Sequence, residues 1–132
     1  MTEIKRIGIW MDHANAHIIE FSEQPKKTTT VTSAFAKQDK DETLQRSESE
    51  LHNKQQHSQL AYRKSLAAVI RNCGEVLLFG PTDAKIELFN FLRKDPLFNN
   101  IKIEVRNADK MSDKQQHAVV RDYFKKLVFK SL

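Results

Sequence analysis

The sequence predicts an α/β domain in which helices flank a mixed five-stranded sheet, with the elements in the order βββαβαβα. Residues 4–35 contain short segments with alternating apolar positions, which are typical of an antiparallel meander. From about Gln59 onward, segments with helical apolar spacing alternate with short apolar segments that are typical of buried strands. Strands separated by helices pair in parallel through crossover connections. The expected sheet therefore joins an antiparallel meander to parallel strands.

The meander is expected to contain three strands. Ile7 and Ile9 alternate with smaller or charged residues in "IKRIGIW", and "HIIEF" and "TTTVT" supply two further segments rich in β-branched residues. Between the first two segments, "DHANA" supplies residues that favour a tight turn.

A polar segment, residues 36–57, follows the meander. It is rich in charge and serine, and Leu44 and Leu51 are its only large apolar residues. Because so little apolar surface is available to offset the entropy of ordering, the segment is predicted to be a mobile loop. It is either an arm that reaches a partner or a solvated insertion.

The second half of the chain alternates helices with strands. A helix from about Gln59 carries apolar residues at helical spacing, "EVLLF" is a buried strand, and "DAKIELFNFLRK" is a helix that stops before Pro96. "IKIEV" is the fifth strand. The last helix opens at Ser112, where Gln115 completes a capping box, and its apolar stripe is Val120, Tyr123, Phe124, Leu127 and Val128.

The size and charge of the chain limit its functions. At 132 residues it is expected to form one domain, residues 1–132, and its net charge of +5 favours anionic partners such as RNA. The single Cys73 excludes an internal disulfide and a metal site built from cysteines. The segment "MTEIKRIGIW" has no apolar h-region of the kind found in signal peptides, and no apolar run has membrane-spanning length, so a cytoplasmic protein without membrane contact is expected.

The segment "LFGPTDAK", residues 78–85, superficially resembles a phosphate-binding loop. A Walker loop needs several glycines before its lysine, whereas here Gly80 is followed by Pro81, which has no N–H group to donate. The sequence therefore predicts a structural turn, capped by Thr82 or Asp83, and no nucleotide or other cofactor.

The segment "EVLLFGPTDAKIELFNFL" resembles the strand, Gly-Pro turn and helix in the middle domain of archaeal and eukaryotic class-I peptide release factors and of Pelota. Gly80, Pro81 and Lys85 match best. In addition, "RIGIWMDHANAHIIEF" resembles the opening hairpin of that domain, and "ADKMSDKQQHAVVRDYF" resembles the closing segment of bacterial stand-alone relatives. The resemblance implies a ribonuclease-H-like mixed sheet.

The resemblance does not extend to the catalytic motif of the release factors. They hydrolyse peptidyl-tRNA with a Gly-Gly-Gln triplet, but residues 36–57 contain no glycine. The sequence therefore favours a non-catalytic module, as the resemblance to Pelota also implies. An enzyme stays open as an alternative, either a peptidyl-tRNA hydrolase or a metal-dependent nuclease, with Asp12 and His13 as the candidate acid–base pair. The scattered histidines predict no metal site.

The expected function is binding to the ribosome, to tRNA or to structured RNA. The candidate phosphate contacts flank or enter the polar segment, or lie on the exposed side of the first helix: Lys26, Lys27, Lys37, Lys40, Arg63 and Lys64. A third reading is a protein-binding adaptor, with a homodimer formed through the exposed edge of the meander.

Overall fold

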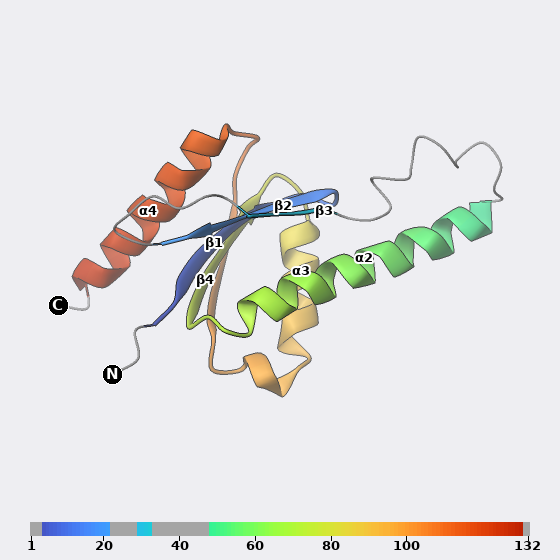
Figure 1. Ribbon diagram of the computed structural model, residues 1–132, viewed down its shortest axis with the longest axis horizontal. Helices are drawn as coiled ribbons and strands as arrows, with labels where there is room; N and C mark the ends of the chain where they lie inside the picture. Colours follow the sequence, from blue (N-terminus) through green and yellow to red (C-terminus); the bar gives the residue numbers. More distant parts are fainter. Residues whose placement is uncertain (1–3, 22–28, 33–47, 131–132) are drawn as a thin grey trace.

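The computed structural model describes residues 4–21, 29–32 and 48–130 of the chain. Its elements confirm the predicted α/β class, the mixed five-stranded sheet and the order βββαβαβα. With the labels of Figure 1, they are β1 (Arg6–Met11), β2 (Asn15–Glu20), β3 (Thr29–Thr32), α2 (Glu48–Ile70), β4 (Glu75–Gly80), α3 (Ala84–Arg93), the short 3-10 helix η2 (Pro96–Phe98), β5 (Lys102–Asn107) and α4 (Asp113–Lys130).

The strands lie in the order β3-β2-β1-β4-β5. The pairs β1–β2 and β2–β3 are antiparallel, as a meander requires, whereas β1–β4 and β4–β5 are parallel. Since β1 and β4 are parallel, their carboxyl ends meet at one edge of the sheet, where Met11 lies next to Gly80. This edge carries the aspartate-led turn after β1 and the Gly-Pro turn after β4.

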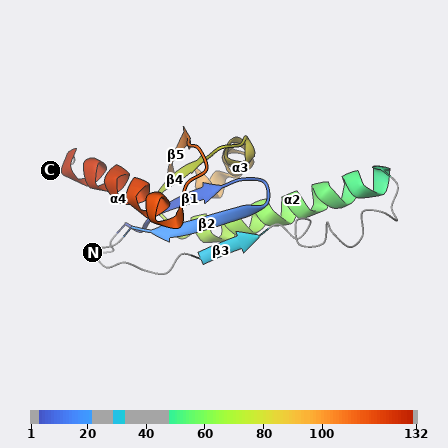
Figure 2. The same ribbon diagram turned by 90° about the horizontal axis from the view of Figure 1, so that it is seen from above.

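Helices cover both faces of the sheet (Figures 1 and 2). On one face, α2 and α3 bury a core that includes Ile9, Leu66, Leu78 and Leu88. On the other face, α4 packs its residues Val120 and Phe124 against Trp10, Leu77 and Phe79. The alternation along β4, with Val76 and Leu78 on one side and Leu77 and Phe79 on the other, places apolar residues on both faces, as is typical of a central parallel strand.

Helix α2 begins earlier than the sequence pattern predicts. It starts at Glu48, so residues 48–57 of the expected mobile loop are helical, while residues 36–47 lie outside the described ranges. Figures 1 and 2 show these first turns extending beyond the sheet. The segment lacks apolar periodicity, but its Glu, Gln, Lys and Leu residues favour a helix that the packed second half of α2 has already nucleated. None of the helices in the described ranges is long and apolar enough to cross a lipid bilayer.

The predicted start of α4 is confirmed in atomic detail. The backbone N–H of Gln115 donates to Ser112 Oγ at 3.2 Å, and the backbone N–H of Ser112 donates to Gln115 Oε1 at 2.9 Å. This reciprocal capping box satisfies two N–H groups that the first turn would otherwise leave unpaired. From this start, Val120 and Phe124 are directed into the sheet, with Tyr123 and Leu127 half-buried at the margin.

Candidate functional site

Asp12 holds the turn between β1 and β2. Its Oδ1 accepts hydrogen bonds from the backbone N–H groups of Ala14 at 2.8 Å and Asn15 at 2.7 Å, and its own N–H donates to the Asn15 carbonyl at 2.9 Å. An aspartate that accepts N–H groups two and three residues onward forms an Asx turn. The carboxylate therefore has a structural role at the position where sequence reasoning placed a candidate acid.

His13 extends from the same turn towards α3. Its Nε2 lies 3.0 Å from Glu87 Oε2, and both side chains are about half exposed, at 48% and 49%. The Gln59 amide on α2 donates to the His13 carbonyl at 2.8 Å. His13 thus has Glu87 as its carboxylate partner, and the turn is connected to both helices that cover this face of the sheet.

The phenol of Tyr62 provides a more buried connection to the turn. Its O–H donates to the Asp12 carbonyl at 2.9 Å, and the side chain is 3% exposed. Burial, followed by the nearby charge of Asp12, raises the pKa of Tyr62 well above its ordinary value. The hydroxyl therefore keeps its proton throughout the neutral range, and α2 stays bonded to the turn there.

We expect Tyr62→Phe to lower the free energy of unfolding by about 1 kcal/mol, because the Asp12 carbonyl loses its hydrogen-bond donor. Urea unfolding followed by circular dichroism measures this. Tyr123→Phe is the control, since the described residues give the Tyr123 hydroxyl no hydrogen-bond partner. Equal losses in the two variants would contradict the assigned role of Tyr62.

The Gly-Pro turn after β4 begins with a backbone conformation that favours glycine. Gly80 has φ +154°, and a Cβ at this position would collide with the carbonyl oxygen of Met11 on β1. After Pro81, the Thr82 hydroxyl accepts from the Ala84 N–H at 3.3 Å, whereas Asp83, at the N-cap position of α3, makes no side-chain capping bond. Of the two predicted caps, the structure therefore selects Thr82.

Lys85 is buried at the start of α3. Only 2% of its surface is exposed, and its Nζ donates to the Thr82 carbonyl at 2.6 Å. The ammonium therefore reaches back across the turn and does not face solvent, where it would meet a phosphate group. The structure brings Gly80, Pro81 and Lys85 together as one closed turn, in agreement with the structural role predicted for "LFGPTDAK".

The two described members of the candidate basic set differ in exposure. Lys64 is exposed on α2, as predicted. Arg63 is only half exposed, because its guanidinium lies over the ring of Phe91 on α3, with Cζ 5.8 Å from the ring centroid. Lys26, Lys27, Lys37 and Lys40 lie outside the described residues.

The second histidine of the hairpin, His17, contacts the opposite face of the sheet. Its Nδ1 lies 2.9 Å from Gln116 Oε1, and its ring stacks on Trp10 with centroids 5.4 Å apart. His13 and His17 therefore contact different helices and do not converge. Among the described residues, no cluster of three or more His, Cys, Asp or Glu side chains is arranged to hold a metal ion.

Sequence reasoning missed the partners of this turn. Glu87 is 74 residues from His13, and nothing in its local sequence distinguishes it from another solvated acid on α3. The sequence does carry a signal for the burial of Tyr62, because this residue lies one helical turn before Leu66 on the buried stripe of α2. The burial of Lys85 has no sequence signal, since lysine is rarely buried.

Comparison with known proteins gives a structural relationship only. No family model matches the sequence, and no curated protein matches it. Among solved structures, Pelota from Archaeoglobus fulgidus is similar with a TM-score of 0.58 at 10% identity, over 98% of this chain and 36% of that one. Pelota from Thermoplasma acidophilum is similar with a TM-score of 0.55 at 14% identity, over 84% and 30% of the two chains.

The chain spans about a third of the length of these Pelota proteins. At this identity the similarity concerns the fold alone. The predicted resemblance to Pelota is thereby confirmed at the level of structure: the chain has the fold of one part of Pelota.

Proposed function

We propose that this protein is a non-catalytic binding module related to translation, which contacts the ribosome, tRNA or structured RNA. The observation that carries the proposal is the similarity of nearly the whole chain to part of Pelota. The contacts at the carboxyl ends of β1 and β4 support a non-catalytic role. The Asp12 carboxylate is engaged by backbone N–H groups, and the Lys85 ammonium is buried against a carbonyl.

The proposed RNA contacts are the basic residues on and before α2. Lys64 is exposed, and the half-exposed Arg63 lies against Phe91 with its guanidinium over the ring. Lys26, Lys27, Lys37 and Lys40 complete the proposed set. The net charge of +5 supports an electrostatic contact of this kind, because phosphate neutralisation dominates RNA affinity.

The test is co-sedimentation with ribosomes, and binding to free tRNA, across a salt series. We expect saturable binding that weakens steeply with salt, because each neutralised phosphate releases counterions. Reversal of Lys26, Lys27, Arg63 and Lys64 to glutamate should abolish binding at moderate salt. At low salt, where residual binding can be measured, the slope of the logarithm of the binding constant against the logarithm of the salt concentration should become less steep. The change should be roughly one for each phosphate that is no longer neutralised.

The matched control reverses four exposed lysines on or near α4, across the sheet from α2: Lys110, Lys114, Lys125 and Lys126. Both variants change the net charge by the same amount. If the control binds RNA as the unmodified protein does, the contact is specific to the first set of basic residues. Equal loss in both variants, or no binding by the unmodified protein even at low salt, would contradict the proposal.

A further inference from the structure

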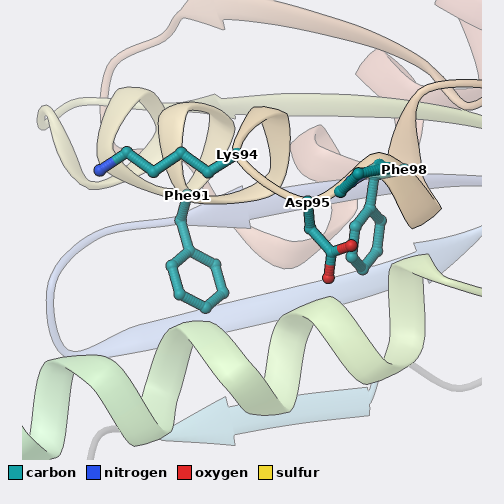
Figure 3. A pocket seen from close by; sticks show the side chains of 5 residues that line it. Phe91, Lys94, Asp95 and Phe98 are labelled. Atoms are coloured by element: carbon teal, nitrogen blue, oxygen red, sulfur yellow. The ribbon is translucent and has the colours of Figure 1, made fainter.

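A groove of about 370 Å³ lies at the end of α3, next to η2, on the side that faces α2 (Figure 3). It is lined by Phe91, Lys94, Asp95, Pro96 and Phe98. Figure 3 shows the rings of Phe91 and Phe98 and the carboxylate of Asp95 directed towards α2, while the stem of Lys94 runs along α3. The volume lies at the lower end of the range for ligand pockets, which is room for one or two large side chains.

An exposed apolar side chain adjoins the groove. Leu97 is 60% exposed, more than Ile4 at 53% or Ile86 at 42%. It belongs to η2, between the lining residues Pro96 and Phe98. Leu97 does not itself line the groove, but it lies between two lining residues in the chain, so a bound segment longer than one residue would reach it.

Two cations adjoin this apolar surface. The Arg63 guanidinium lies over Phe91, and Lys94 is exposed among the lining residues. The acid at the groove, Asp95, already accepts the Leu97 N–H at 3.0 Å as the N-cap of η2. The charge at the rim therefore favours an anionic partner.

The apolar component favours a protein segment over RNA. A nucleobase binds by stacking on an open aromatic face. Phe98 is only 5% exposed and offers no such face, and Arg63 covers one face of Phe91, so the groove provides at most one open ring face. An aliphatic or aromatic side chain, by contrast, is stabilised by burial against Leu97 and the groove without stacking.

We propose that this groove binds a partner protein through a short segment in which a large apolar side chain is flanked by acidic residues. The apolar side chain enters between Phe91 and Phe98, and the adjoining part of the segment covers Leu97. The flanking carboxylates pair with Arg63 and Lys94. Arg63 is the one residue that this contact shares with the proposed RNA contacts. Peptide binding and RNA binding can therefore be tested separately with substitutions at the other residues.

The test uses a library of random peptides displayed on phage and selected on the full-length protein. We expect enrichment of sequences that carry Leu, Ile, Phe or Trp next to Asp or Glu. For an enriched peptide, labelled and measured by fluorescence anisotropy, Leu97→Ser should weaken binding about tenfold. Lys94→Glu should weaken it as well, and the loss should diminish at high salt.

The control is Ile86→Ser, which removes an exposed aliphatic side chain from α3. Ile86 lies on a different side of this helix from Phe91. It should leave peptide binding unchanged. The proposal is overturned if no peptide is enriched, or if enriched peptides bind the Leu97→Ser variant as well as the unmodified protein. It is also overturned if Leu97→Ser weakens binding to tRNA and not to the peptide, because the groove would then belong to an RNA surface.

Discussion

Gly80→Ala should lower the free energy of unfolding by about 3 kcal/mol. Two effects combine at this position. The residue has φ +154°, a conformation that residues with a Cβ rarely adopt, and the added methyl group would collide with the Met11 carbonyl oxygen. Because this oxygen belongs to the backbone of the neighbouring strand β1, no side-chain rotation relieves the collision. The joined ends of β1 and β4 must move apart.

Urea unfolding followed by circular dichroism measures the loss. Pro81→Ala is the control, because it changes the next residue of the same turn, at an exposed position, without adding atoms. It should cost about 1 kcal/mol or less, mainly through greater freedom of the unfolded chain. A Gly80→Ala variant as stable as the Pro81→Ala variant would show that the turn does not depend on glycine.

Gly8→Ala should lower the free energy of unfolding by about 2 kcal/mol, for a different reason. Gly8 lies on β1 beneath α4, and a Cβ there would collide with the Cγ2 methyl group of Val120. Val120 is buried, and a β-branched side chain in a helix has one strongly preferred rotamer, so it does not swing aside. The helix must lift from the sheet to accept the methyl group.

Here the obstacle is a side chain, so a second substitution removes it. Val120→Ala alone should also destabilise the protein, by about 2 kcal/mol, through the cavity it leaves. In the double variant the new methyl group at position 8 occupies part of that cavity. The decrease in the free energy of unfolding of the double variant should therefore be smaller than the sum of the decreases in the two single variants, by at least about 1 kcal/mol. Strict additivity of the two losses would contradict the close contact of α4 with β1.

The pattern of apolar residues was sufficient to predict the architecture. Alternation in "IKRIGIW" and helical spacing around Leu66 and Ile70 identified the strand and the packed half of α2, and both patterns arise directly from burial. The capping box at Ser112 was equally readable, because the two residues that form it lie three positions apart in the chain. The first turns of α2 were missed, since they lack the apolar period on which the prediction depended.

The candidate site was less predictable, because its contacts join residues far apart in the chain. The motif Gly80-Pro81 and the resemblance to Pelota were visible in the sequence, and the resemblance is confirmed as one of fold. The pairing of His13 with Glu87 and the groove beside η2 were not visible. They depend on how α2 and α3 pack against the same face of the sheet.

The sequence by itself determined the fold class, the order of the elements and the turn that joins β4 to α3. These follow from local periodicity and from residues with distinctive backbone preferences, such as Gly80, which tolerates a positive φ, and Pro81, whose φ is fixed. Only the tertiary structure decided that Lys85 is buried, that Arg63 lies against Phe91, and that Leu97 remains exposed beside a groove. The environment of a charged or apolar side chain depends on which distant elements cover it, and that information is absent from its immediate neighbours in the chain.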